Sequence, residues 1–245
     1  MKQTQLLMGM PITVELIDKK AAKADIKEVF SYFNYIDEKF STYKQTSEIS
    51  KINQGLLKKN EYSHDMKTIF RLSEQTKNET RGYFDVEHEG KIDPSGLVKG
   101  WAVYEAAKLL QKKGLENFYI EAGGDIQISG KNSEGKYWTV GIRNPFDREE
   151  IVKVVKLYNK GIATSGTYIR GQHIYNPKIK DAKLEEVLSL TVIGPNVYEA
   201  DRFATAAFAM GKVGIGFIEN LPGFEGYLID KTGTATYTSG FKIYL

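Results

Sequence analysis

Residues 118–158 read FYIEAGGDIQISGKNSEGKYWTVGIRNPFDREEIVKVVKLY, and this stretch decides the fold class. It contains three runs rich in β-branched and aromatic residues, and Gly, Asn and Pro separate them. Such runs are typical of strands joined by turns, and the short connections predict an antiparallel meander. A further run, VLSLTVIG at 187–194, predicts another strand, and the tail at 226–245 predicts a terminal hairpin.

Helical patterns flank these strands. The first strand is expected at 10–17. Apolar side chains at helical spacing predict four helices, at 26–40, 66–75, 94–114 and 199–211. Asp25, with Glu28 three residues later, is a candidate start for the first helix. Asp93 is a candidate N-cap with Pro94 in the first turn, and Gly114 is a candidate C-terminal stop.

No proline-rich or low-complexity linker divides the chain, so we expect one α+β domain over residues 1–245. Strands and helices occur in separate groups, which predicts largely antiparallel sheets with packed helices, arranged as two interleaved lobes. The 245 residues are enough for a large hydrophobic core.

The composition excludes several classes of function. The chain has no cysteine, so disulfides, thiolate metal sites and a cysteine nucleophile are ruled out, and catalysis would depend on oxygen and nitrogen groups. The net charge is only +3 and the basic residues are interspersed with acidic ones, so we expect no nucleic-acid partner. The first residues, MKQTQLLMGMP, predict neither a secretion signal nor a membrane span, and we expect a cytoplasmic protein.

Five polar segments interrupt the regular pattern: residues 8–9, 41–53, 82–85, 93–100 and 123–125. Glycine beside acidic and aromatic residues is typical of binding loops. The same residues are also ordinary in turns and helix caps, so each segment alone leaves both interpretations open.

Asp201 and Thr205 are four residues apart near the start of a predicted helix, so their oxygens would lie on one face. A carboxylate and a hydroxyl are suitable ligands for Mg²⁺. The alternative is that Asp201 only caps the helix and complements its dipole.

The three histidines differ in context. We expect His64 and His88 to be surface residues. His173 lies in a loop, where it has either a structural role or the role of a general base near neutral pH. Residues 161–166, GIATSG, predict either a strand ending in a turn or an oxygen-rich wall facing phosphate.

Taken together, the polar segments resemble the ApbE family, the FAD:protein FMN transferases. The resemblance follows the order of these stretches: MGMPITVEL from Met8, FSTYKQTSEISKIN, GYFDV, DPSGLVKGWAV, EAGGDIQISG, IATSGTYIRGQHIYNP and EADRFATAAFAMG. It implies a fold related to the T-fold. It also implies an enzyme that uses Mg²⁺ to cleave FAD, attaches FMN to a Thr or Ser of a target flavoprotein, and releases AMP.

The resemblance also assigns residues. The positions that would line the FAD site are Met8, Thr42, Tyr83, Phe84, Asp85, Asp93, Lys99 and Ile174. The positions that would hold Mg²⁺ are the carbonyls of Gly96 and Ala204 and the side chains of Asp201 and Thr205. His173 would deprotonate the acceptor hydroxyl, and Asp201 would act with it in catalysis.

The chain departs from the family pattern at two points. Asn176-Pro177 replaces Asp-Pro and the following Thr-Gly is missing, and Gly96 stands where Ala is common. The sequence leaves two other functions open: an FAD pyrophosphatase that releases FMN and AMP, and a flavin-binding protein without catalysis.

Overall fold

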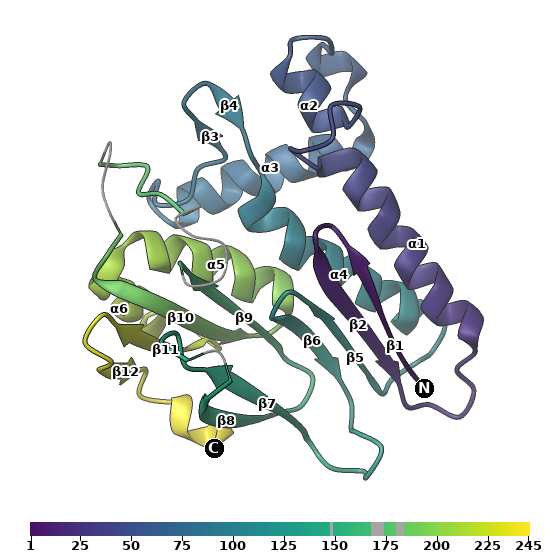
Figure 1. Ribbon diagram of the computed structural model, residues 1–245, viewed down its shortest axis with the longest axis vertical. Coiled ribbons are helices and arrows are strands. Elements are labelled where there is room, and N and C mark those ends of the chain that lie inside the picture. Colours follow the sequence, from purple (N-terminus) through teal and green to yellow (C-terminus); the bar gives the residue numbers. More distant parts are fainter. Residues whose placement is uncertain (148, 168–173, 180–183) are drawn as a thin grey trace.

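An eight-stranded antiparallel sheet forms the middle of the protein in the computed structural model, which describes residues 1–147, 149–167, 174–179 and 184–245 (Figure 1). Its strand order is β1-β2-β5-β6-β9-β10-β11-β12. The strands are β1 Lys2–Leu7, β2 Met10–Leu16, β5 Phe118–Ala122, β6 Asp125–Ser129, β9 Gly161–Gly166, β10 Val187–Gly194, β11 Glu225–Asp230 and β12 Ala235–Tyr237. Two further strand pairs, β3 Glu87–His88 with β4 Lys91–Ile92 and β7 Trp138–Arg143 with β8 Ile151–Leu157, lie outside this sheet.

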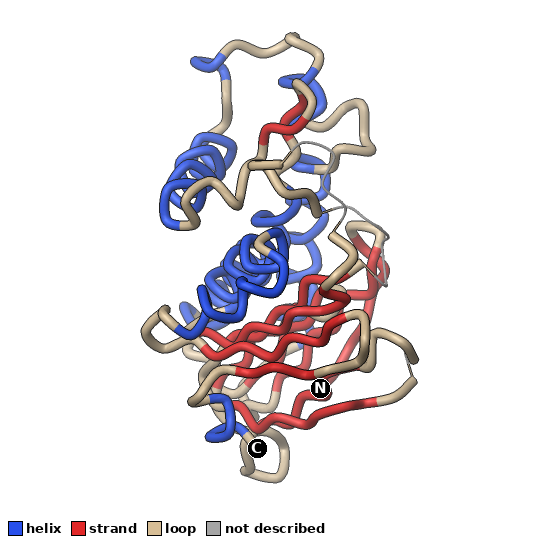
Figure 2. The backbone as a smooth tube through the Cα atoms, turned by 90° about the vertical axis from the view of Figure 1, so that its left-hand side faces the viewer, coloured by secondary structure: helices blue, strands red, loops and turns tan. Residues whose placement is uncertain are grey.

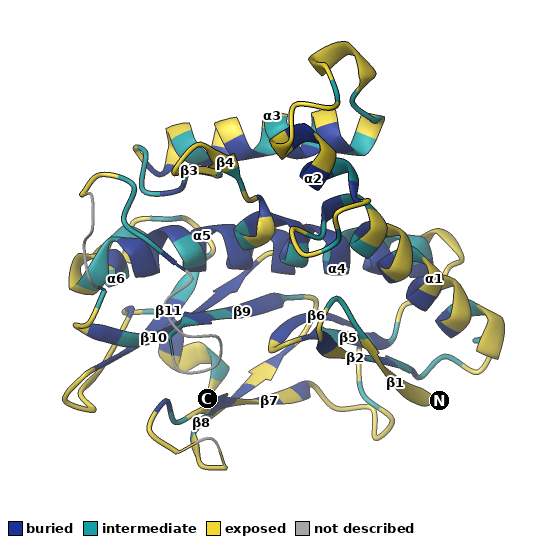
Figure 3. Cartoon of the chain, turned by 45° about the horizontal axis from the view of Figure 1, so that its top comes forward, coloured by how far each residue is buried: buried dark blue, intermediate teal, exposed yellow. Residues whose placement is uncertain are grey.

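The helices lie mainly against one face of the sheet (Figure 2). They are α1 Lys23–Phe40, α2 Glu48–Asn53, α3 His64–Glu79, α4 Ser95–Lys112, α5 Val197–Ala209 and α6 Gly214–Glu219. Helices α4 and α5 form the layer next to the strands, and α3 lies on the outer side of that layer (Figure 3). None of the helices in the described residues is both long and apolar enough to cross a lipid bilayer.

Alternating side chains give the sheet two buried faces, because successive residues of a strand point to opposite sides. Ala163, Val192 and Leu228 belong to a core cluster shared with α5 and α6. Their neighbours Ile162 and Ile193 belong to the opposite cluster, which packs under β7, β8 and a 3₁₀ turn at Phe241–Tyr244. A third cluster joins β2 and β5 to α1, α3 and α4.

The structure confirms the predicted α+β class, the strand expected at 10–17, which is β2, and the four helices. It also confirms the terminal hairpin, in which β11 pairs with β12. The predicted meander over 118–158 is wrong in its second half. Strand β6 pairs with β9 rather than with β7, and β7 pairs only with β8 among the described residues. The intervening 138–157 hairpin instead covers the far face of the sheet, where Trp138, Val140 and Val155 are buried.

The predicted helix starts are displaced by a few residues. Helix α1 follows Ala22 as its N-cap, and Asp25 occupies the third helical position, where its carboxylate accepts a 2.8 Å hydrogen bond from the Ala22 N–H. Helix α4 begins after Pro94, and the Asp93 carboxylate accepts a 2.9 Å bond from the Ser95 N–H. Both acidic residues still satisfy N-terminal amides, although neither is the N-cap.

Candidate functional site

A pocket opens between the segment after α3, the start of α4, the end of β9 and helix α5. It collects residues from three of the five polar segments, 82–85, 93–100 and 123–125, and from positions more than one hundred residues apart. The predicted site residues that line it are Tyr83, Phe84, Asp85, Asp93, Gly96, Lys99, Ile174, Asp201 and Thr205. Three polar segments that are separate in the sequence therefore surround one cavity.

The aromatic wall of the pocket begins where α3 ends. Gly82 has a φ of +81°, which turns the chain sharply after the helix, and its N–H donates a 2.7 Å bond to the Lys77 carbonyl. The Phe84 N–H donates a 3.1 Å bond to the Thr80 hydroxyl. Tyr83 and Phe84 both line the cavity, but Phe84 is buried in the core at 4% exposure, whereas Tyr83 is half-buried.

The segment 174–179 is joined to this wall by three contacts. The Tyr175 hydroxyl donates a 2.6 Å hydrogen bond to the Asp85 carbonyl, and the Tyr175 ring stacks on His88 at 3.8 Å. The Lys178 ammonium lies 4.5 Å from the centre of the Tyr83 ring. Ile174, which is buried, is thereby held at the edge of the pocket.

Lys99, which lines the pocket, forms an ion pair with Asp125 behind it. Lys99 extends from the second turn of α4, and its ammonium lies 2.8 Å from the Asp125 carboxylate. Asp125 is fully buried at the start of β6, and its other oxygen accepts a long hydrogen bond of 3.4 Å from the Thr164 N–H. The pair places a cation at the N-terminal end of α4, where an anionic ligand is also favoured by the helix dipole.

Asp201 lies on α5, with only 3% of its surface exposed. Its carboxylate accepts a 2.8 Å hydrogen bond from the Gly100 N–H of α4. Burial raises the pKa of Asp201 well above its usual range, and the negative charge of nearby Asp125 raises it further, while Lys99 opposes the shift. The helix-capping alternative is wrong, because the N-cap of α5 is Asn196, whose side chain accepts the Glu199 N–H at 3.0 Å.

The Thr205 hydroxyl lies one helical turn after Asp201. It donates to the Gly96 carbonyl at 3.3 Å and lies 3.5 Å from the Ser165 hydroxyl. A carboxylate, a hydroxyl and a carbonyl thus converge on the same cavity. A buried carboxylate with a raised pKa is stabilised in its ionised form by a bound cation, so this oxygen set suits a hard divalent ion.

Neutral oxygens are essential to such a site. Across the described parts of the chain, no group of three or more His, Asp or Glu side chains is placed to hold a metal ion. A cation at Asp201 would therefore depend on carbonyl and hydroxyl ligands and on water or ligand oxygens.

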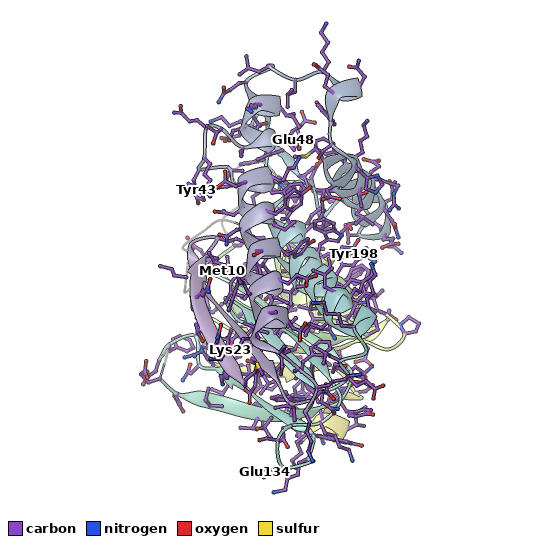
Figure 4. The ribbon with its side chains drawn as sticks, turned by 90° about the vertical axis from the view of Figure 1, so that its right-hand side faces the viewer. Met10, Lys23, Tyr43, Glu48, Glu134 and Tyr198 are labelled. Atoms are coloured by element: carbon purple, nitrogen blue, oxygen red, sulfur yellow. The ribbon has the colours of Figure 1, made fainter. Side chains whose placement is uncertain are left out.

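Three predicted residues are not among the described residues that line the pocket. Met8 lies in the β1–β2 turn with a φ of +53°, and Ala204 is fully buried within α5. Thr42 is exposed in the loop after α1, and its neighbour Tyr43 projects into solvent at 97% exposure (Figure 4). His173 lies outside the described residues, so its predicted role stays a prediction.

The sequence assigns no individual role to Asp125, Thr164 or Ser165. Asp125 belongs to the Gly-Gly-Asp segment at 123–125, in which Gly123 lines the pocket and Asp125 pairs with Lys99. Thr164 and Ser165 line the cavity at the end of β9, as the oxygen-rich wall interpretation of 161–166 predicts. The pairing of Asp125 with Lys99 had no signal in the sequence, because 26 residues separate them.

The chain is similar to several known proteins. The family model of the ApbE family matches residues 8–90 and 86–228. An FAD:protein FMN transferase of Klebsiella pneumoniae strain 342 is 31% identical over 163 residues, which are 63% of this chain and 45% of that protein. An FAD:protein FMN transferase of Vibrio cholerae is 33% identical over 130 residues, 49% of this chain and 39% of that protein. The matched regions thus span less than half the length of these curated relatives.

Solved structures share the fold. The flavin transferase ApbE from Vibrio cholerae superposes with a TM-score of 0.87 at 24% identity, over 100% of this chain and 99% of that chain. The ApbE protein from Thermotoga maritima gives a TM-score of 0.85 at 22% identity, over 100% and 98%. The family model covers most of the sequence and these structures match the whole fold, so the chain belongs to the ApbE family.

Proposed function

We propose that this protein is a Mg²⁺-dependent FAD:protein FMN transferase. It would cleave FAD, attach FMN through a phosphoester bond to a Thr or Ser of a target flavoprotein, and release AMP. The observation that carries the proposal is the convergence of Asp201, Thr205 and Lys99 on one pocket in a chain of the ApbE family. The names of the curated relatives support the transfer of FMN from FAD to a protein.

The pocket offers groups suited to the parts of FAD. The half-buried ring of Tyr83 presents a flat surface for a flavin or adenine ring, and Asp85 and Asp93 are acceptors for ribose or base N–H and O–H groups. Lys99 supplies positive charge for the phosphates. Met8, Thr42 and Ile174 complete the set that we assign to the substrate.

Four residues would hold the metal: Asp201 and Thr205 through their side chains, and Gly96 and Ala204 through their carbonyls. The burial of Asp201 beside Asp125 supports this assignment, because the charge of a buried carboxylate is unfavourable and a bound cation would compensate it. When bound, Mg²⁺ would neutralise the negative charge that develops on the phosphate oxygens.

The chain's own residues would then position the reactants. In the reaction, the acceptor hydroxyl oxygen bonds to the FMN phosphorus, and the bond from that phosphorus to the oxygen bridging to AMP breaks. AMP leaves with the bridging oxygen. We assign His173 as the base that takes the hydroxyl proton, a role worth roughly 10²–10⁴-fold in rate. Lys99 would hold the phosphates in place during the transfer.

The test is to incubate the protein with FAD, Mg²⁺ and candidate flavoproteins encoded in the same genome. The expected products are AMP and a flavoprotein that carries covalent FMN, seen by mass spectrometry and by in-gel flavin fluorescence. Free FMN and AMP formed equally well without any acceptor would instead identify a pyrophosphatase. FAD binding without turnover would identify a flavin-binding protein.

A further inference from the structure

Arg202 directly follows Asp201 on α5, but its buried guanidinium contacts α3. Only 4% of its side chain is exposed. One terminal nitrogen donates a 3.2 Å hydrogen bond to the Thr76 hydroxyl and also pairs with the Glu79 carboxylate, both on α3. The Nε and the other terminal nitrogen bind Glu199 on α5 itself, at 2.8 and 2.5 Å. Arg202 therefore joins two helices through one planar group.

The α3 end of this link leads directly into the aromatic wall of the pocket. The Thr80 hydroxyl donates a 2.7 Å bond to the Thr76 carbonyl and accepts the Phe84 N–H. Thr76 itself is fully buried, and its hydroxyl is the group that accepts the bond from Arg202. A short series of hydrogen bonds thus runs from Arg202 through Thr76 and Thr80 to Phe84.

Asp201 and Arg202 therefore bind helices that carry different walls of the same cavity. Asp201 is bonded to Gly100 of α4, beside Lys99 and Asp125. Arg202 is bonded to the last turn of α3, from which Tyr83 and Phe84 follow. Two consecutive residues of α5 thus contact α4 beside Lys99 and the last turn of α3 before the aromatic wall.

We propose that Arg202 is a positioning residue that holds the Tyr83–Phe84 wall at a fixed distance from Asp201, and so sets the affinity for FAD. This inference rests on the proposed function for the identity of the ligand. Arg202 does not line the pocket in the described structure and takes no part in the chemistry. Its effect is on how well the ligand fits between the two walls.

Arginine is suited to this role because its planar fork can donate to both helices at once. A lysine has one ammonium and cannot bind Glu199, Thr76 and Glu79 in the same geometry. A hydrophobic side chain could pack between the helices but would not define their relative position by directed bonds.

The two carboxylate partners of Arg202 provide a matched pair of variants. Glu79→Gln weakens the link to α3, whereas Glu199→Gln removes a charge of equal size that binds the same arginine within α5. Both replacements keep the shape of the side chain. Both carboxylates are partly exposed, so we expect both variants to fold, and thermal melting checks this.

Two measurements test the proposal. Hydrogen exchange of the Gly82 and Phe84 amides, without any ligand, should accelerate in Glu79→Gln and stay at the wild-type rate in Glu199→Gln. The KM for FAD should rise several-fold in Glu79→Gln with kcat little changed, because a loss of ligand fit removes uniform binding. Arg202→Lys should show the same KM change as Glu79→Gln.

The outcomes separate this inference from the proposed function. Equal exchange rates and equal KM values in Glu79→Gln and Glu199→Gln would overturn the positioning role of Arg202. Faster exchange in Glu79→Gln, in a protein that never binds FAD, would support the link between α3 and α5 and contradict the proposed function.

Discussion

The Asp201 carboxylate accepts a 2.8 Å hydrogen bond from the backbone N–H of Gly100, and this bond joins α5 to α4 inside the pocket. A side chain at position 100 would prevent it. A Cβ there would lie 2.6 Å from the Asp201 Cβ and 2.9 Å from both an Asp201 carboxylate oxygen and the Val197 carbonyl. The buried carboxylate thus depends on a glycine of the neighbouring helix.

Gly100→Ala should therefore both destabilise the protein and lower its activity. The added methyl group must separate α4 from α5, and such overpacking costs roughly 1–3 kcal/mol of unfolding free energy. Chemical denaturation measures the loss of stability, and FAD turnover measures the loss of activity.

The matched control is Gly216→Ala in α6, where an added Cβ would meet nothing within 4 Å. This variant should be stabilised by about 0.5–1 kcal/mol, because alanine favours the helix, and its activity should not change. If Gly100→Ala is as stable and active as Gly216→Ala, the close approach of α4 and α5 does not support the site.

Substitutions at the two side chains of the proposed metal site should abolish or reduce the stabilisation of the protein by Mg²⁺. A ligand that binds only the folded state raises the melting temperature. The wild type should melt higher in Mg²⁺ than in EDTA, Asp201→Asn should show no such difference, and Thr205→Val should show a smaller one. Thr205→Ser keeps the hydroxyl and should behave as the wild type does. An undiminished Mg²⁺ effect in Asp201→Asn would place the ion elsewhere.

Tyr83 and Phe84 should have separable effects although they are adjacent. Tyr83 lines the pocket and is half-buried, so Tyr83→Ala should weaken FAD binding by ~0.5–1.5 kcal/mol, up to about tenfold in Kd, with little effect on melting. Phe84 is 4% exposed within the core, so Phe84→Ala should cost about 3–5 kcal/mol of stability. Titration with FAD measures the Kd, and denaturant unfolding measures the loss of stability. Unchanged affinity in Tyr83→Ala would remove it from the ligand site.

Glu48 should make the protein sensitive to acid. Burial raises the pKa of Glu48, but hydrogen bonds from the Ser63 N–H at 2.7 Å and from Lys39 at 3.0 Å outweigh it, and the net pKa is below its ordinary 4.5. The ionised Glu48 side chain therefore contributes folding stability that is complete above pH 4.5. This contribution is lost as the pH falls through the pKa of Glu48 in the folded protein.

Glu48→Gln should therefore be less stable than the wild type at pH 7, and the difference should shrink below pH 4.5. Denaturant unfolding at a series of pH values measures it. A stability difference that does not depend on pH would show that the carboxylate charge is not what ties α2 to the start of α3.

The fold was predictable where the burial of side chains requires a recognisable pattern of apolar residues in the sequence. Helix α1 has buried apolar side chains every three or four residues, so its pattern is clear in the sequence. Helix α5 and strand β10 are buried almost throughout, and their predominantly apolar runs predict them instead. Strand β1 was missed because five of its six residues are exposed at the edge of the sheet and show no apolar alternation. Helix α2 was missed because it is only six residues long and is fixed by tertiary packing of Ile49 and Ile52.

Strand pairing was less predictable than strand identity. Short connections favoured pairing of the strands at 118–158 in order, but β6 pairs with β9, and the hairpin between them covers the other face of the sheet. Pairing depends on which apolar faces meet in three dimensions, and that information is not local in the sequence.

The site was predictable mainly through its resemblance to a family. Individually, Asp201 had an equally good explanation as a helix cap, and only the structure placed its carboxylate at Gly100 and the cap at Asn196. The ion pair of Lys99 with Asp125 and the contact of Arg202 with Glu79 depend on residues far apart in the chain. No spacing rule finds such pairs.

The measurement that tests the central proposal most directly is peptide mass spectrometry of an acceptor flavoprotein after incubation with FAD and Mg²⁺. The account predicts one FMN joined by a phosphoester to a single Thr or Ser, with one AMP released for each FMN attached, and no adduct with Asp201→Asn or His173→Ala. An acceptor that stays unmodified while the wild type converts FAD to free FMN and AMP would contradict it.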